Sequence, residues 1–213
     1  MFDQRTLVIE TATAACSVAL IESGVVVASA HEVVGRGHAE RLVPMIAELP
    51  GQGRAGRILV DVGPGSFTGI RVGLAAAIGL GIGWGVPVAG YSSLTLLAAA
   101  AFDREDVAGM LAVVTEGGHG EVFMQTFGPP PMMLSTPLES LTPHAARERL
   151  GGLHAVGDGL RWLQFDDPRS APRGALPNAA DAILLPEALA ALPPRPIYGR
   201  APDARTLAER GVA

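Results

Sequence analysis

The sequence contains no lysine, a single cysteine and no long run of basic residues. All 16 cationic side chains other than histidine are arginines, against 21 acidic ones, so the net charge is −5. A chain of this charge without a basic patch is a poor candidate for direct binding of RNA or DNA phosphates. Cys16 alone excludes an internal disulfide and a cysteine-based zinc site, and its apolar surroundings in the sequence predict a small core residue.

Charge is also missing from Val72 to Phe102. This run is broken by Gly73, Gly79, Gly81, Gly83, Gly85 and Pro87 and then by Tyr91-Ser92-Ser93, so it predicts helix, strand and helix and not a membrane span. The first ten residues, MFDQRTLVIE, lack the apolar core of a signal peptide. We therefore expect a cytoplasmic protein without membrane contact.

The order of the expected elements indicates the fold of the first half. Hydrophobic patterning predicts three consecutive strands, then a helix, a buried strand, a long helix opened by Ser66 and ended by Gly85, a further strand and a further helix. Their ranges are 7–12, 15–23, 25–33, 37–49, 57–62, 66–84, 86–91 and 93–102. This β-β-β-α-β-α-β-α order predicts a mixed five-stranded sheet with helices on both faces, the α/β lobe of ribonuclease-H-like proteins and of the actin-like ATPase superfamily.

A charged segment, FDREDV (102–107), is the expected boundary between a lobe at 1–103 and a smaller, degenerate lobe of the same type at 104–213. The second half predicts strands at 110–116, 121–127 and 154–158 and helices at 142–150 and 178–192. Pro186 interrupts the last of these helices, as Pro44 interrupts the helix at 37–49, where we expect a short first turn or a kink.

The stretch VDVGPGSFTGIRVG (60–73) has the outline of a phosphate-binding loop, a buried strand that leads through glycines into a helix. It lacks the Gly-Lys-Ser/Thr of a P-loop and the spacing of the dinucleotide-binding fingerprint. Backbone N–H groups at the helix start allow at most weak nucleotide binding. We interpret Gly63, Pro64, Gly65 and Ser66 as a structural loop, with a positive φ at one of the glycines and Ser66 as the helix N-cap.

Candidate catalytic groups are few. A hydrolase would use Ser66 as nucleophile with His38 or His119 as base, but the G-x-S-x-G elbow is absent. The five histidines include no pair at i, i+4, so we expect no metal site and no tightly bound cofactor.

Several motifs together resemble the TsaB (YeaZ) family: IETATAACSVAL (9–20), HAERLVPMI (38–46), GPGSFTGIRVGLAAAIGL (63–80), VPVAGYSSL (86–94), GEVF (120–123) and PIYGRAPDAR (196–205). The resemblance is dense over 7–102 and thin over 128–195. It implies a catalytically inactive member of the actin-like ATPase superfamily. The chain departs from the family at Glu10 and Glu116, where an aspartate is usual, and both changes argue against tight magnesium geometry.

The resemblance further implies a partner role in making threonylcarbamoyladenosine on tRNA. The chain would bind TsaD and, with TsaE and ATP, support threonylcarbamoyl transfer from threonylcarbamoyl-AMP to the adenosine 3′ of the anticodon, touching tRNA only through the complex. Alone it would form a homodimer. The alternative from another class is a free-standing phosphotransferase or peptidase.

The long helix at 66–84 carries apolar residues all the way round, which predicts burial on two sides. The small residues Ala75, Gly79 and Gly83 form a ridge that allows close approach of another backbone, either a partner or a helix of the second lobe. On the helix at 37–49, Arg41 and Met45 are expected off the core stripe of Leu42, Ile46 and Leu49. The resemblance places the partner interface on these two helices, at His38, Arg41, Met45, Arg71, Leu74, Ala75, Ile78 and Gly79.

Overall fold

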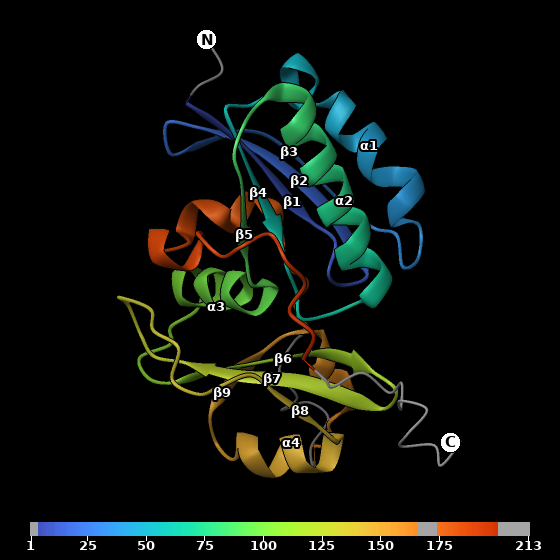
Figure 1. The fold of residues 1–213 in the computed structure, drawn as a ribbon. Coiled ribbons are helices and arrows are strands. Elements are labelled where there is room, and N and C mark those ends of the chain that lie inside the picture. Colours follow the sequence, from blue (N-terminus) through green and yellow to red (C-terminus); the bar gives the residue numbers. More distant parts are fainter. Residues whose placement is uncertain (1–3, 166–173, 200–213) are drawn as a thin grey trace, which may run out of the picture.

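The structure, a computed structural model, describes residues 4–165 and 174–199, so residues 200–205 of the last motif lie outside it. The first sheet contains β1 (Arg5–Glu10), β2 (Ala15–Glu22), β3 (Val25–Val33), β4 (Arg57–Asp61) and β5 (Val88–Tyr91), in the order β3-β2-β1-β4-β5 (Figure 1). β1, β2 and β3 pair antiparallel, whereas β4 pairs parallel with β1 and β5. The predicted mixed five-stranded sheet is confirmed.

Helices cover both faces of this sheet. α1 (His38–Glu48) and α2 (Phe67–Trp84) pack on one face against Leu7, Ile9 and Leu20, and α3 (Ser93–Arg104) lies on the other. The predicted ends of α2 are confirmed. The Ser66 hydroxyl accepts the Gly69 N–H at 3.2 Å, and Gly85 ends the helix in the left-handed conformation, which glycine adopts without strain.

A four-stranded second sheet repeats the first on a smaller scale. It contains β6 (Leu111–Gly118), β7 (Glu121–Phe127), β8 (Glu139–Leu141) and β9 (His154–Val156), with α4 (Pro143–Leu150) between β8 and β9. Its order, β8-β7-β6-β9, matches β3-β2-β1-β4, and β9 again pairs parallel with the central strand. The expected second lobe is therefore confirmed, and it includes β8, a three-residue strand that the sequence did not indicate.

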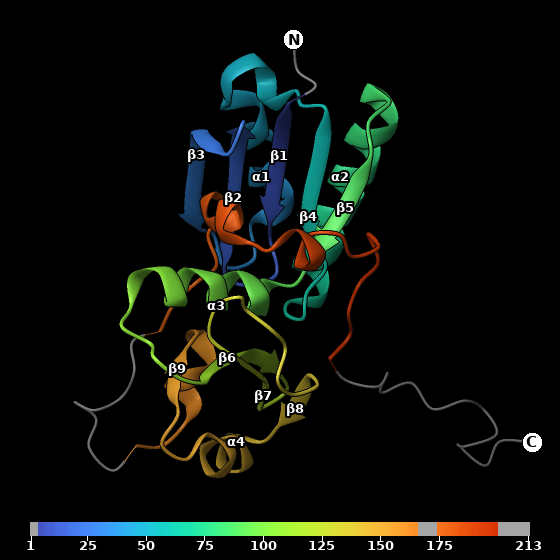
Figure 2. The same ribbon diagram turned by 90° about the vertical axis from the view of Figure 1, so that its left-hand side faces the viewer.

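α3 is the layer that the two sheets share (Figure 2). Leu96 joins a cluster with Val8 and Leu59 of the first sheet, while Leu94 and Leu97 pack against the second sheet. All residues from Ser93 to Ala101 are buried. α4 covers the far face of the second sheet, so the chain folds in alternating helical and sheet layers.

The predicted helix at 178–192 is wrong. The structure has two short 3₁₀ helices, Ala179–Leu184 and Glu187–Leu189, laid on the first sheet beside α3 (Figure 2). Leu192 exchanges backbone hydrogen bonds with Gly90 of β5, and Ile197 N–H donates to the Val62 carbonyl at 2.7 Å. Sheet contacts outweigh the helix propensity of the alanines and leucines. The division at 103 and 104 stays a prediction, because residues 178–197 pack on the first sheet, while Leu184, Leu185 and Leu189 also pack against the cluster of α3 and the second sheet.

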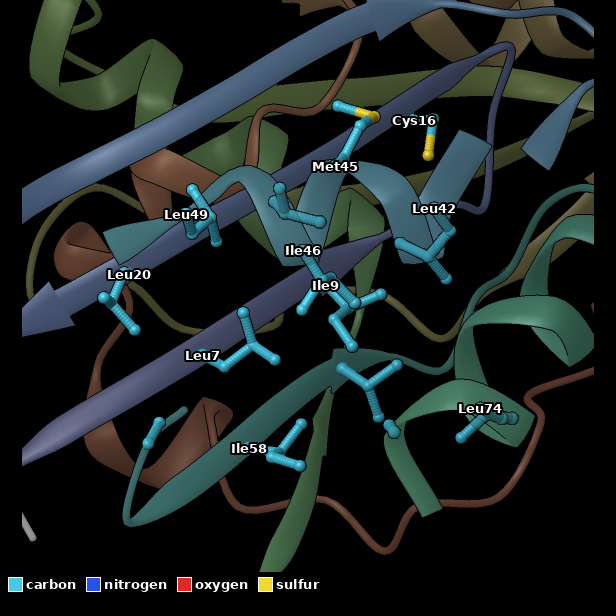
Figure 3. Packing of buried hydrophobic residues seen from close by; sticks show 14 of the residues in the cluster. Leu7, Ile9, Cys16, Leu20, Leu42, Met45, Ile46, Leu49, Ile58 and Leu74 are labelled. Atoms are coloured by element: carbon cyan, nitrogen blue, oxygen red, sulfur yellow. The ribbon is translucent and has the colours of Figure 1, made fainter. Parts of the chain in front are cut away.

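The prediction for α1 is also corrected. α1 runs continuously through Pro44, and Met45 is fully buried among Cys16, Leu42 and Ile46 instead of lying off the core stripe (Figure 3). Spacing explains this, because positions 42, 45, 46 and 49 follow the i, i+3, i+4, i+7 pattern of one helix face. The core position of Cys16 is confirmed, and burial raises the pKa of its thiol to about 11.

The glycines of α2 divide between two faces. On the inner face, a Cβ on Gly69 would lie 2.1 Å from the Thr11 carbonyl oxygen, and one on Gly73 would lie 2.3 Å from the Thr11 hydroxyl. On the outer face, Gly79 and Gly83 have nothing within 4 Å. α2 is long and apolar enough to cross a membrane, but its inner face packs on the first sheet.

The approach of the loop to β1 generates the first prediction. Gly65→Ala should lower the free energy of unfolding by about 1–3 kcal/mol, because its Cβ would lie 2.1 Å from the Ala12 carbonyl oxygen and force the loop to move. Gly79→Ala is the matched control, and it should raise the stability by about 0.5–1 kcal/mol because Gly79 lies mid-helix in open space. Urea denaturation of both variants measures these opposite signs. Equal stability of Gly65→Ala and the wild type would contradict the packing argument.

Candidate functional site

The GPGS loop is tied to the turn between β1 and β2. Ser66 N–H donates to the Ala12 carbonyl at 2.6 Å, and the Ser66 hydroxyl is engaged with Gly69 N–H. Gly63 adopts a φ of +93°, and the Gly63–Pro64 peptide is cis. The expected positive φ is therefore found at Gly63, and the expected N-cap role of Ser66 is confirmed. The Ser66 and Gly69 N–H groups at the start of α2 therefore already have partners within the chain, which leaves fewer N–H groups there to bind an anion.

The acidic residues at the end of the first sheet face inward. Glu10 and Asp61 are fully buried. Asp61 accepts the Thr11 N–H at 2.8 Å and the Gly63 N–H at 3.1 Å. Glu10 accepts the Ala12 N–H at 2.9 Å through Oε1, while Oε2 lies 3.1 Å from the Tyr91 hydroxyl. No arginine pairs with either carboxylate among the described residues, so these acids interact with neutral groups and with each other's charge.

Burial raises the pKa of Glu10 well above its usual range, and the nearby Asp61 charge raises it further. Burial also raises the pKa of Asp61 to about 6, against the opposing effect of its backbone N–H donors. The hydrogen bonds agree with a neutral Glu10. The Tyr91 hydroxyl lies 3.0 Å from the Ile9 carbonyl as well as 3.1 Å from Glu10 Oε2, and its single hydrogen serves only one of them. A protonated Glu10 satisfies both contacts.

The second sheet carries acids at the corresponding end. Asp158 follows β9 and accepts the Glu116 N–H at 3.1 Å, as Asp61 follows β4 and accepts the Thr11 N–H. Glu116 forms an ion pair with Arg161, and burial raises the pKa of Asp158. Asp158 was not predicted as a site residue. The HAVGDG sequence indicates this position, because an acid directly after a parallel strand lies at the sheet edge where ligands bind. The sequence alone does not show that β9 pairs parallel with β6, so Asp158 could not be assigned from it.

A cleft of about 860 Å³ lies between the two lobes. Of the predicted site residues it includes Gly65, Ser66 and Arg71, whereas Gly63 and Pro64 do not line it. Of the two acids at which the chain departs from the family, Glu116 lines the cleft and Glu10 does not. Asp158 and His119 line it from the second lobe, and Ile197-Tyr198-Gly199 forms part of its wall. Part of the loop and Glu116 are therefore brought together, while Glu10 is turned into the core.

The residues expected at a partner interface separate into two groups. His38, Met45 and Leu74 are buried within the chain itself, and the His38 ring lies 3.0 Å from the Ala15 carbonyl. Arg41 is half-buried in ion pairs with Glu32 and Glu48, which hold its pKa above the ordinary range. The exposed group consists of Arg71, Ala75, Ile78 and Gly79.

The expected burial of α2 on two sides is found on one side within the described residues, and burial of the other side by a partner stays a prediction. Only the inner side is covered, and Ile82 is 79% exposed on the other. Val43, 60% exposed, belongs to the neighbouring surface of α1. We define the outer face as the exposed residues Val43, Phe67, Arg71, Ala75, Ile78, Gly79 and Ile82. A second-lobe helix, the alternative cover, does not lie on it.

Nucleophile and metal chemistry find little support in the geometry. No recorded hydrogen bond joins the Ser66 hydroxyl to His38 or His119 in the described ranges. Over residues 4–165 and 174–199, no three His, Cys, Asp or Glu side chains come close enough together to hold a metal ion. The cleft holds Ser66, His119, Glu116 and Asp158 without a serine–histidine hydrogen bond or a metal cluster among the described residues.

Comparison with known proteins relates these features to two families. A family model described as TsaD, tRNA N6-adenosine threonylcarbamoyltransferase, matches residues 24–128. The tRNA threonylcarbamoyladenosine biosynthesis protein TsaB of Escherichia coli is 39% identical over 127 residues, which are 56% of this chain and 53% of that protein. The chain thus spans about half the length of this curated relative, and 48% of its Haemophilus influenzae counterpart.

Two further relatives match over nearly the whole length. An uncharacterized protein of Mycobacterium tuberculosis is 31% identical over 95% of this chain and 94% of its own. The solved structure of YeaZ from Pseudomonas aeruginosa superposes with a TM-score of 0.73 at 27% identity, covering 85% of this chain and 90% of that one. With these matches and the two-lobed topology, the chain belongs to the TsaB (YeaZ) family, whose curated members are named for tRNA threonylcarbamoyladenosine biosynthesis.

Proposed function

We propose that this chain is a non-catalytic subunit of the machinery that makes threonylcarbamoyladenosine on tRNA, and that it binds TsaD through the outer face of α1 and α2. The observation that carries the proposal is the uncovered outer face itself. A helix as apolar as α2 normally buries both sides, yet Ile78 and Ile82 are 42% and 79% exposed. Exposed apolar surface of this extent is typical of an interaction site.

The likeness to TsaD favours that partner. The family model covers residues 24–128, which include α1 and α2, so TsaD is expected to carry the same pair of helices. Two similar faces can pair about an approximate two-fold axis, as identical faces do in a homodimer. The same argument allows a homodimer of this chain when TsaD is absent. An interface of ordinary size would bury about 800 Å² on each partner.

The rest of the assignment follows from the family. TsaE and ATP act in the complex, and the chain supports threonylcarbamoyl transfer from threonylcarbamoyl-AMP to the adenosine 3′ of the anticodon. tRNA contacts pass through the complex, since the chain carries a net charge of −5 and no basic run. We expect no tightly bound cofactor, at most weak nucleotide binding in the cleft, and action in the cytoplasm.

The rival function is a free-standing phosphotransferase or peptidase. A phosphotransferase needs carboxylates in the cleft from both lobes, but Glu10 and Asp61 are fully buried and line no part of it. A peptidase needs a base beside Ser66, whose recorded hydrogen bond is with Gly69 N–H. Both observations support the non-catalytic role.

The second prediction tests the outer face. Gly79→Arg should leave the chain folded, because nothing lies within 4 Å of a Cβ there, and should weaken TsaD binding at least about 100-fold by placing a bulky charge in an apolar contact. Calorimetric titration with TsaD measures the dissociation constant, and a reconstituted tRNA modification assay should fail in parallel. Gly152→Arg is the matched control, since its Cβ also meets open space but lies on the second lobe.

Wild-type affinity in Gly79→Arg would refute the proposed interface. Sedimentation provides a separate check, because one shared face requires added TsaD to dissolve the homodimer. A homodimer that persists in a ternary assembly would mean that two different faces are used.

The third prediction concerns the buried acids. Because the folded-state pKa values of Glu10 and Asp61 lie above the unfolded ones, their contribution to stability is full below pH about 4 and is lost as pH rises through the folded values. Glu10→Gln keeps a carbonyl for Ala12 N–H and offers an N–H to the Tyr91 hydroxyl without a charge. We therefore expect the variant to be more stable than the wild type at pH 8, by about 1 kcal/mol or more, and close to it at pH 4.5.

Asp61→Asn is the contrasting variant. Both Asp61 oxygens accept N–H donors, so an amide turns one NH₂ toward a donor and should destabilise the fold at every pH. Urea denaturation at the two pH values measures both variants. If Glu10→Gln lost stability equally at both pH values, Glu10 would be ionised in the fold. Loss of a steady ATPase activity in Glu10→Gln would instead support the phosphotransferase.

A further inference from the structure

Three side chains form a cluster at the N-terminal end of α2. The Arg71 guanidinium lies 3.5 Å over the Phe67 ring and donates a 3.0 Å hydrogen bond to the Tyr198 hydroxyl. The two aromatic rings are 5.9 Å apart. Phe67 and Tyr198 remain 57% and 49% exposed. We call Phe67, Arg71 and Tyr198 the α2 cluster. It brings together the first turn of α2 and a residue 127 positions further along the chain.

The chain holds Tyr198 in place from both sides. Ile197 N–H donates to the Val62 carbonyl at 2.7 Å, and the Ile197 side chain packs against the first core cluster. Gly199 lies against the Phe123 ring, so close that a Cβ there would approach it to 2.4 Å. An aromatic ring fixed by its neighbours loses little conformational entropy when a partner covers it. The α2 cluster is thus preorganised for contact.

Arg71 presents an uncompensated charge. It is exposed, and its recorded polar contact in the described ranges is the neutral Tyr198 hydroxyl; the ion pairs there all belong to other residues. Stacking on Phe67 fixes the guanidinium while leaving most of its donors unused. A carboxylate accepts two parallel N–H bonds from such a group. The surface therefore fits an acidic side chain delivered by a partner.

The α2 cluster continues the outer face without a break. Along α2 the exposed positions Phe67, Arg71, Ala75, Ile78 and Ile82 recur every three or four residues, so they form one stripe with the α2 cluster at its end. Aromatic residues and arginine are the residue types that most often dominate binding energy in interfaces. An occupant of the apolar part of the stripe would reach the α2 cluster as well.

We propose that the α2 cluster anchors one end of the TsaD interface, and that Arg71 there receives a carboxylate of TsaD. The inference rests on the proposed function and adds the C-terminal segment to the docking surface. Tyr198 lies outside residues 24–128, where the chain resembles TsaD. The α2 cluster is thus a feature by which the face of this chain differs from the corresponding face of TsaD. It favours binding of TsaD over binding of a second copy of this chain.

Calorimetric titration of TsaD with four variants tests this, at low and at physiological salt. Arg71→Met keeps much of the apolar stem and removes the charge, so it should weaken binding about 30-fold and reduce the dependence of affinity on salt. Tyr198→Ala should weaken binding about 10-fold, and Tyr198→Phe, which keeps the ring, about 2–5-fold. Trp162→Ala is the matched control. Trp162 is 52% exposed and lies beside Arg161 at 5.3 Å, but on the second lobe, and its loss should leave the affinity unchanged.

The outcomes separate this inference from the proposed function. If Gly79→Arg abolishes binding while Arg71→Met and Tyr198→Ala bind as the wild type does, the α2 cluster lies outside the interface and only the inference fails. If Gly79→Arg also binds normally, the proposed function fails. Weakened self-association with unchanged TsaD binding would assign the α2 cluster to a second copy of this chain and overturn the proposal. Should Tyr198→Ala lower the melting temperature, Arg71→Met and Tyr198→Phe decide, because both keep the local packing.

Discussion

The close approach of α2 to the turn after β1 is the constraint on which the rest of the structure depends. Carbonyl and hydroxyl oxygens of Thr11 and Ala12 occupy the space that side chains at Gly65, Gly69 and Gly73 would need. Hydrogen bonds then fix the contact, from Ser66 N–H to Ala12 and from the Thr11 hydroxyl to the Gly69 carbonyl at 2.9 Å. The glycines of a loop that looks suited to phosphates therefore serve backbone packing, a use that their lack of a Cβ equally allows.

This packing also determines where the acids of the first lobe lie. Thr11, held under α2, donates its N–H to Asp61, and the same turn places Ala12 N–H on Glu10. Both carboxyls are consequently enclosed, and one proton on Glu10 relieves the repulsion between them. In the second lobe, β9 is followed within the described residues by the short 3₁₀ helix Asp158–Trp162, and Glu116 and Asp158 line the cleft. Among the described residues, the acids that line the cleft come from the second lobe, whereas metal-dependent phosphoryl transfer needs several positioned oxygens.

Residues close together in the sequence were enough to predict the first lobe. Ser66 and Gly85 set the ends of α2 through a side-chain hydrogen bond and a left-handed φ, and β1, β2 and β3 are joined by short turns that the sequence shows directly. The misses arose where distant contacts decide. The 3₁₀ segments after Asn178 owe their course to β5 and α3, and Asp158 gains meaning only once β9 lies parallel to β6. Met45 is different, because its spacing from Leu42 already placed it on the core stripe and the miss was one of interpretation.

α2 is apolar on both sides, and its two faces have different packing requirements. Gly69, Gly73, Ala77 and Gly81 recur every four residues on the inner face, where close packing leaves no room for larger side chains. Phe67, Ile78 and Ile82 occupy the outer face, where size adds contact area. If the outer face binds TsaD as proposed, the helices alone distinguish poorly between a second copy and TsaD, because the TsaD family model matches residues 24–128, which include both helices. Under that proposal, discrimination comes from residues at the border of the shared surface, and Tyr198 lies at that border beside Arg71.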